Sequence, residues 1–142
     1  MPQSETPITA KLTLPATHES FARLREFVLD QASGLSPELV VKIDLVVEEL
    51  LLNIINYAYE PDRPGTVTVE CGFEAGRGFV LRLLDSGKPF NPLERPDPDP
   101  ALGLEDRNVG GLGIFLVKEM SLSQDYRRQD GANILEIVFG TE

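Results

Sequence analysis

The sequence is poor in the residue types that build cross-links and metal sites, with one cysteine, Cys71, and one histidine, His18, among 142 residues. A single cysteine excludes a disulfide framework and a multi-cysteine metal site, and Cys71 is expected to be a small buried hydrophobe. There is no run of about 18 apolar residues, and segment 1–9 has no basic stretch followed by an apolar one. We therefore expect a cytoplasmic protein that does not associate with membranes.

Basic residues are also scarce, since 13 Lys and Arg oppose 23 Asp and Glu for a net charge of −10. This balance argues against direct binding to nucleic acid. To bind a polyanionic ligand, the protein would need a local source of positive charge, either the N–H groups at a helix N-terminus or a bound cation. The length and the 42% hydrophobic content suit one core, so a single domain over 1–142 is expected.

Hydrophobic periodicity predicts helices grouped against a mostly antiparallel sheet, an α+β two-layer sandwich with the helices on one face. Thr17 is expected to cap the first helix, and Ser36 with Pro37 to open the second. Proline-rich segment 88–103 is expected to be an extended loop. The expected helices are 19–32, 37–59 and 113–120. The expected strands are 9–14, 66–74, 79–84, 125–129 and 133–139, the last two joined by a turn at Asp130 and Gly131.

The second expected helix is apolar at most positions and should be buried nearly all round. Its polar residues Glu49, Asn53 and Asn56 share one stripe about 60° wide. A carboxylate in such a setting is costly unless it is satisfied, and a Mg²⁺ ion with its waters would satisfy it. The alternative is a solvated edge of a core helix. Asp44 and Glu48 lie away from the stripe and are expected to be ordinary exposed charges.

Asp85-Ser86-Gly87 follows the expected strand 79–84 directly. A carboxylate at a strand end can accept a hydrogen bond from an exocyclic amine, which distinguishes adenine from guanine. Glycine allows the backbone to approach a flat ligand. The same tripeptide is also an ordinary turn.

A second glycine motif, Val109-Gly110-Gly111-Leu112-Gly113, is expected to precede an apolar helix. This arrangement presents free N–H groups and the positive end of the helix dipole to an anion. No Gly-Lys-Ser/Thr follows, and no strand precedes the motif, so it is neither a P-loop nor a dinucleotide fingerprint. By itself the cluster is a weak signal.

Three segments, taken in order, resemble the three sequence motifs of the Bergerat ATP-binding fold. Their residues are similar to those of the bacterial anti-sigma-factor serine kinases. They are Glu49-Leu-Leu-Leu-Asn53, Asp85-Ser-Gly87-Lys-Pro-Phe90 and Gly110-Gly111-Leu112-Gly113. The resemblance covers about residues 8–139.

The resemblance implies an ATP-dependent protein serine kinase that uses Mg²⁺. It makes Glu49 the general base, Asn53 a Mg²⁺ ligand and Asp85 the residue that reads adenine. Segment 91–109 becomes an ATP lid. The other implied nucleotide-binding residues are Gly87, Phe90, Gly110, Gly111, Leu112 and Gly113. The implied partners are a STAS-type anti-anti-sigma protein, phosphorylated on serine, and a sigma factor or equivalent regulator held inactive.

Two other classes stay open. One is an ATP-sensing switch that binds its partner without transferring phosphate, although retention of Glu49 favours the enzyme. The other is the catalytic half of a histidine kinase, but His18 lies between a strand and a helix start and is interpreted as a surface residue. The first strand is expected at a sheet edge, where it would be available for a symmetric homodimer.

Overall fold

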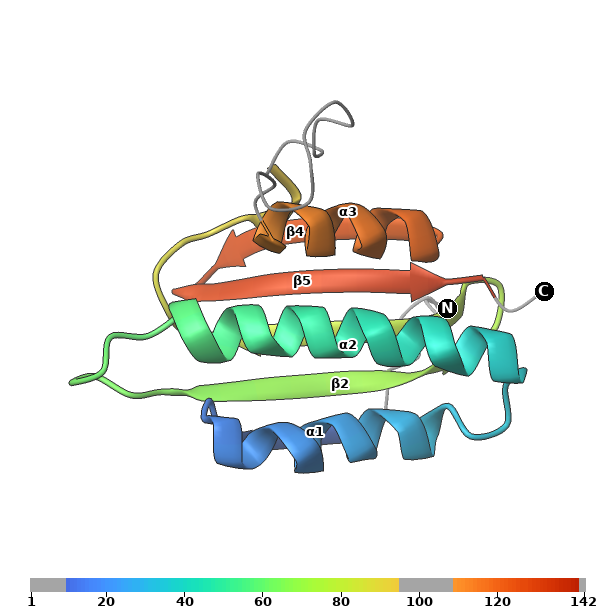
Figure 1. Cartoon of the computed structure of the whole chain (residues 1–142), viewed down its shortest axis with the longest axis horizontal. Helices are drawn as coiled ribbons and strands as arrows, with labels where there is room; N and C mark the ends of the chain where they lie inside the picture. Colours follow the sequence, from blue (N-terminus) through green and yellow to red (C-terminus); the bar gives the residue numbers. More distant parts are fainter. Residues whose placement is uncertain (1–9, 95–108, 141–142) are drawn as a thin grey trace, which may run out of the picture.

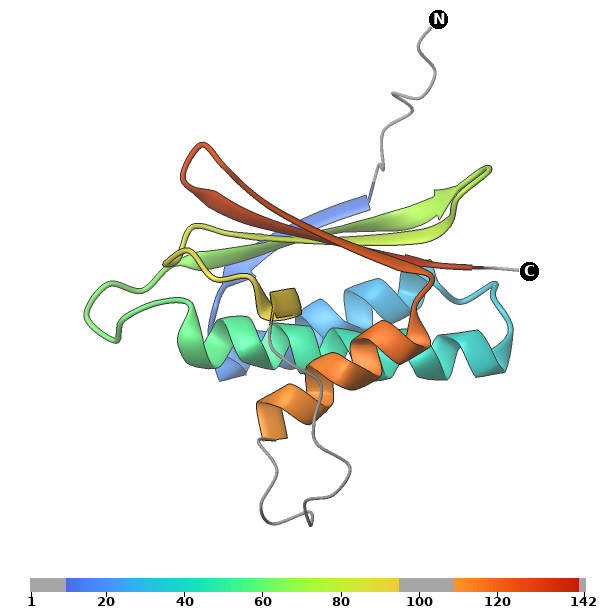
Figure 2. The same ribbon diagram turned by 90° about the horizontal axis from the view of Figure 1, so that it is seen from above.

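The computed structural model describes residues 10–94 and 109–140, with the backbone alone for 109–112. Three helices lie on one face of a five-stranded antiparallel sheet with the order β1-β2-β3-β5-β4 (Figure 1 and Figure 2). The predicted α+β class and two-layer architecture are confirmed. The elements are β1 (Ala10–Pro15), α1 (His18–Gln31), α2 (Pro37–Tyr57), β2 (Thr66–Glu74), β3 (Gly78–Asp85), the 3₁₀ helix η2 (Pro92–Glu94), α3 (Val109–Met120), β4 (Ser123–Gln129) and β5 (Ala132–Phe139).

Local capping chemistry sets the starts of the first two helices. The Thr17 side chain accepts a hydrogen bond from the Ser20 amide at 3.2 Å, and the Ser36 hydroxyl accepts one from the Leu39 amide at 3.3 Å. Each bond satisfies an N–H group that the helix itself cannot pair. Both predicted caps are confirmed.

The core lies between the inner face of the sheet and the helices. Alternate residues of β2, namely Val67, Val69 and Cys71, point into it and are fully buried. Burial raises the pKa of the Cys71 thiol to about 12, because the thiolate would lose its hydration. The prediction that Cys71 is a buried hydrophobe is confirmed.

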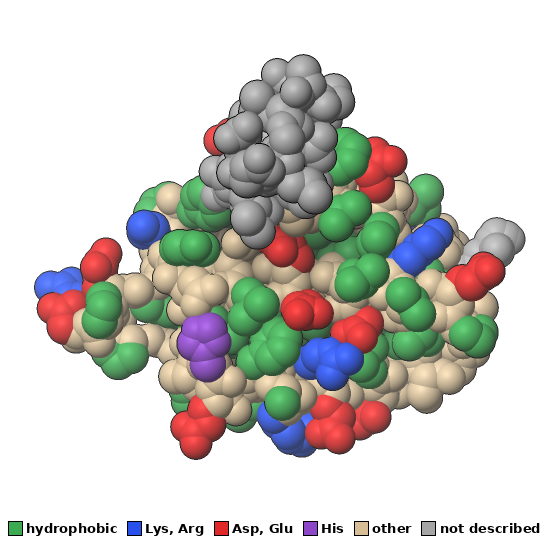
Figure 3. Space-filling model, viewed as in Figure 1, with side chains coloured by type: hydrophobic (Ala, Val, Ile, Leu, Met, Phe, Trp, Pro, Cys, Tyr) green, Lys and Arg blue, Asp and Glu red, His purple; other side chains and the backbone are tan. Residues whose placement is uncertain are grey.

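The prediction that the second helix is buried nearly all round is wrong. Val41 and Leu45 of α2 are 58% and 46% exposed, and hydrophobic side chains are visible over this helix in Figure 3. The sheet and the flanking helices leave one side of α2 open. The prediction that Asp44 is an ordinary exposed charge is also wrong. Its carboxylate is partly buried and accepts hydrogen bonds of 2.6 and 2.7 Å from the guanidinium of Arg25 on α1. Glu48 is exposed, as predicted.

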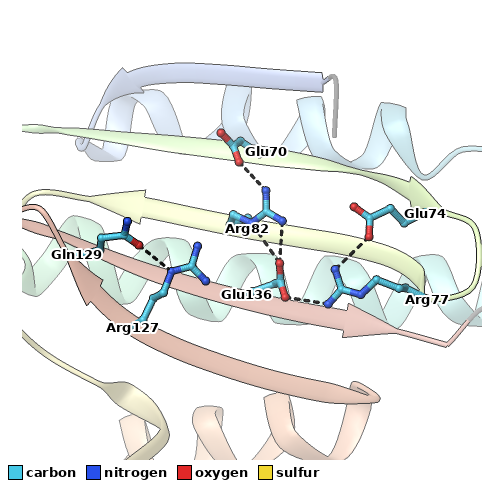
Figure 4. Close-up of polar contacts among 7 residues, drawn as sticks. All are labelled: Glu70, Glu74, Arg77, Arg82, Arg127, Gln129 and Glu136. Atoms are coloured by element: carbon cyan, nitrogen blue, oxygen red, sulfur yellow. Dashed lines mark hydrogen bonds and ion pairs between the residues drawn. The ribbon is translucent and has the colours of Figure 1, made fainter. Parts of the chain in front are cut away.

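No helix covers the outer face of the sheet within the described residues, and long charged side chains lie across it (Figure 4). Arg82 binds Glu70 at 2.9 Å and Glu136 at 2.7 Å, and Arg77 binds Glu136 at 2.8 Å and Glu74 at 3.0 Å. Burial alone would raise the pKa of the Glu136 carboxyl. The two arginine hydrogen bonds outweigh burial and hold that pKa below its usual value.

The predicted hairpins are confirmed. Asp130 and Gly131, with φ of 54° and 80°, form the turn between β4 and β5. β1 lies at an edge of the sheet, as predicted. In the described part of the chain, no helix is long and apolar enough to cross a membrane.

Two expectations about the segment between β3 and α3 change. The loop expected over 88–103 contains the short helix η2, and α3 begins at Val109, earlier than the predicted 113. The glycine motif therefore forms the first turns of α3 and does not precede it. Positions 95–108 of the predicted lid lie outside the described residues.

Candidate functional site

A pocket opens between the C-terminal half of α2, the ends of β3 and β5, and the chain that follows β3. Its walls are mostly apolar and carry a small number of polar groups, which is typical of small-molecule sites. Among the lining residues are Leu50, Asn53, Tyr57, Leu83, Asp85, Phe90, Tyr126 and Asn133.

Asp85 is the acidic group of this pocket and is only 8% exposed at the end of β3. Its Oδ1 accepts hydrogen bonds from the Gly87 amide at 2.9 Å and from Asn133 Nδ2 at 3.0 Å. Among the described residues, no donor binds Oδ2. One oxygen thus orients the carboxylate, and the other keeps its capacity to accept a hydrogen bond from a ligand.

Asn133 is a residue that the sequence reasoning missed. Its side chain is 6% exposed, and besides Asp85 its Nδ2 donates to the Lys88 carbonyl at 2.9 Å. Its Oδ1 accepts from the Tyr126 hydroxyl at 2.5 Å and from the Phe90 amide at 3.4 Å. A signal was present in the sequence, because Asn133 has the same strand parity as the core residues Leu135 and Ile137.

The turn after Asp85 is bound to the end of α2. The Lys88 amide donates to the Ala58 carbonyl at 3.1 Å, and a Cβ on Gly87 would overlap that same carbonyl group. The Tyr59 hydroxyl accepts from the Ser86 amide at 2.8 Å and donates to the Thr66 carbonyl at 2.6 Å. Glycine at position 87 is therefore required by close backbone approach.

The polar stripe of α2, made of Glu49, Asn53 and Asn56, does not face a single site in the structure. Asn53 lines the pocket, and within the described ranges its side-chain amide makes no hydrogen bond. Asn56 lies away from the pocket, where its Oδ1 is 2.8 Å from Nε2 of the exposed His18. Of the three polar residues of this stripe, only Asn53 lines the pocket.

Glu49 and Gly113 come together between α2 and α3, outside the residues that line this pocket. A Cβ on Gly113 would overlap the Glu49 carboxylate, so a larger residue at position 113 would require the Glu49 side chain to move. Gly110, Gly111 and Leu112 belong to the first turn of α3. Amide groups in the first turn of a helix have no intrahelical partner and suit an anion.

The residues present fit a nucleotide with a hard cation. Asp85 and the pocket suit a base with an exocyclic amine, and the start of α3 suits phosphate. In the part of the chain that the structure describes, no three His, Cys, Asp or Glu side chains cluster as a metal site. The amide oxygen of Asn53 is a ligand of the kind that Mg²⁺ accepts together with substrate phosphates.

Comparison with known families assigns the chain. Residues 14–139 match the histidine kinase-like ATPase domain, and the chain belongs to this family. Membership implies that it binds ATP.

Among curated proteins, the chain is similar to two bacterial kinases. Serine/threonine-protein kinase BtrW of Bordetella bronchiseptica is 28% identical over 102 residues, which cover 72% of this chain and 71% of BtrW. Serine-protein kinase RsbW of Listeria monocytogenes is 26% identical over 117 residues, which cover 80% of this chain and 74% of RsbW. The chain thus resembles RsbW-type kinases at low identity.

Two solved structures show the same fold. The blue-light activated histidine kinase of Erythrobacter litoralis has a TM-score of 0.56 at 24% identity, with 75% of this chain and 32% of that chain covered. The histidine kinase domain of the same protein has a TM-score of 0.56 at 19% identity, covering 90% and 62%. The chain spans less than two thirds of each structure, and the likeness extends to the fold alone.

Proposed function

We propose that this chain is an ATP-dependent protein serine kinase that acts as an anti-sigma factor. It phosphorylates a serine of a STAS-type anti-anti-sigma protein and sequesters a sigma factor or similar regulator. The observation that carries the proposal is the approach of Gly113 to the Glu49 carboxylate, one helical turn from Asn53. The names of BtrW and RsbW support serine phosphorylation.

In this proposal Asp85 accepts a hydrogen bond from the adenine amine, with Gly87 giving the close backbone approach and Phe90 contacting the base. Asn53 is a ligand of Mg²⁺. The free amides of the first turn of α3, the turn that contains Gly110, Gly111 and Leu112, hold the phosphates, while Gly113, the fifth residue of the helix, contributes its close approach to Glu49. Bound ATP and Mg²⁺ supply the transferable phosphoryl group and the neutralising charge.

Glu49 orients the incoming serine hydroxyl and accepts its proton. General-base catalysis is usually worth about 10²–10⁴ in rate. The helix dipole of α3 stabilises the negative charge on the phosphoryl oxygens during transfer. Binding and chemistry are separable, because Glu49 faces the hydroxyl and Asp85 faces the base.

The test is to incubate the protein with γ-labelled ATP, Mg²⁺ and each purified anti-anti-sigma candidate from the same genome, and to map the labelled residue. Glu49→Gln should lower single-turnover transfer by about 10²–10⁴ with little change in ATP affinity. Glu60→Gln is the matched control, because Glu60 is exposed just beyond α2.

Unchanged transfer by Glu49→Gln would remove this residue from the mechanism. Absence of transfer in the wild type with every candidate, despite ATP-dependent binding of one of them, would favour the ATP-sensing switch.

A further inference from the structure

A second hollow lies between α2 and α3. We call it the α2–α3 groove. Its walls include Leu45, Glu48, Glu49 and Leu52 of α2 and Gly113 and Leu116 of α3. Glu49 and Gly113 thus belong both to this groove and to the proposed transfer site.

The groove exposes large apolar side chains to water. Leu45 and Leu116, on opposite walls, are 46% and 41% exposed, and Val41 lies one helical turn beyond Leu45 at 58%. Single exposed hydrophobic residues are ordinary on protein surfaces, but a contiguous group marks an interaction surface. Figure 3 shows hydrophobic and acidic side chains side by side over these helices.

The charge of the groove has one sign. Its ionisable wall residues are Glu48 and Glu49, no Lys or Arg is among its described wall residues, and Glu48 is exposed. Asp44 lies one helical turn before Glu48 on the same side of α2 but is not a wall residue of the groove; its carboxylate is paired with Arg25, whose guanidinium also interacts electrostatically with Glu48. A partner that combines apolar side chains with a basic one therefore complements this surface.

Helix geometry sets the spacing of such a partner. Leu45 precedes Glu49 by one turn of α2, a rise of about 6 Å, and Val41 lies about 6 Å further along. If the partner's serine lies at Glu49, the partner residue that contacts Leu45 is about 6 Å away from it. That distance corresponds to two residues of an extended segment, at about 3.3 Å per residue, or to one turn of a helical segment.

We propose that the α2–α3 groove docks the protein substrate. Its occupant is a partner segment that presents a serine to Glu49, an apolar side chain to Leu45 and Leu116, and a Lys or Arg to Glu48. This proposal rests on the proposed function, since it names the surface by which the partner reaches that site.

The test measures partner affinity and ATP affinity separately for the variants Leu45→Gln and Glu48→Lys. Both positions are exposed, so the fold is expected to be preserved. The probes are the purified anti-anti-sigma candidates and ATP with Mg²⁺. For each variant we expect the partner's Kd by calorimetry, and its KM in transfer, to rise about tenfold or more, the scale of an interface residue that contributes strongly. ATP affinity should stay within twofold.

Matched controls come from the sheet side of the molecule. Leu122→Gln changes an exposed leucine just before β4, 68% exposed against 46% for Leu45, and Asp125→Lys reverses the charge of an exposed acidic residue on β4. Both controls should leave the Kd and the KM of the partner unchanged.

Equal effects of groove and control variants would overturn the docking assignment. A dimer of the wild type that Leu45→Gln dissociates in light scattering would also overturn it, because the groove would then bind a second copy. Partner binding without phosphoryl transfer would refute the kinase function. The docking assignment would still be tested in that case, by the ratio of the partner's Kd for the groove variants to its Kd for the wild type. No partner binding in either nucleotide state would overturn both.

Discussion

Replacing Asn133 by alanine should weaken both the fold and nucleotide binding, because this buried amide orients Asp85. The substitution removes the 3.0 Å bond to Asp85 Oδ1, the 2.9 Å bond to the Lys88 carbonyl and the 2.5 Å bond from the Tyr126 hydroxyl. Neutral bonds are worth about 1 kcal/mol each, and a bond to a charged group about 1.5–3 kcal/mol. We expect the free energy of unfolding to fall by about 3.5–5 kcal/mol.

Nucleotide affinity should fall less than stability, since the Gly87 amide still holds Asp85 Oδ1 at 2.9 Å. We expect a loss of about tenfold in ATP affinity, or about 1.4 kcal/mol. Urea denaturation gives the first quantity, and calorimetry at a temperature where the variant is folded gives the second.

Tyr126→Phe is the matched control for this experiment. It removes only the hydroxyl that donates to Asn133 and leaves the Asn133 to Asp85 bond in place. Stability should fall by about 1 kcal/mol, and ATP affinity should fall less than in Asn133→Ala. If folded Asn133→Ala bound ATP as tightly as the wild type, the argument that Asn133 positions Asp85 would be refuted.

Three further predictions concern the base, the cation and acid stability. Asp85→Asn should weaken the binding of ATP and ADP by about 1.5–3 kcal/mol and remove the preference over GTP. Equal affinities of the wild type for ATP and GTP would refute the assignment of Asp85 as the residue that reads adenine. Asn53→Ala should abolish the difference in ATP affinity between Mg²⁺ and chelator, and survival of that difference would make Asn53 a structural residue. The Glu136 pKa lies below the usual 4.5, so its arginine pairs stabilise the fold above that pH and the stabilisation is lost as pH falls through the lower folded value. The urea midpoint should therefore drop below about pH 4.5, less steeply in Glu136→Gln, and equal slopes would exclude this carboxyl as a cause.

Local chemistry in the sequence determined most of the helices and strands. The caps at Thr17 and Ser36 and the turn at Asp130 act over a few residues, so they can be interpreted without a fold. The same holds for the spacing of Glu49 and Asn53 on one helix face. Periodicity establishes which residues share a face but not what covers that face.

The tertiary structure decided the contacts that join distant segments. Asn133 meets Asp85 because β5 pairs with β3 in the register that sets these two residues opposite each other, and Asn56 meets His18 because α1 packs beside α2. Likewise, Val41 is exposed because neither the sheet nor a flanking helix covers that side of α2. Such contacts follow from the packing of whole elements, whose positions depend on many weak interactions spread along the chain.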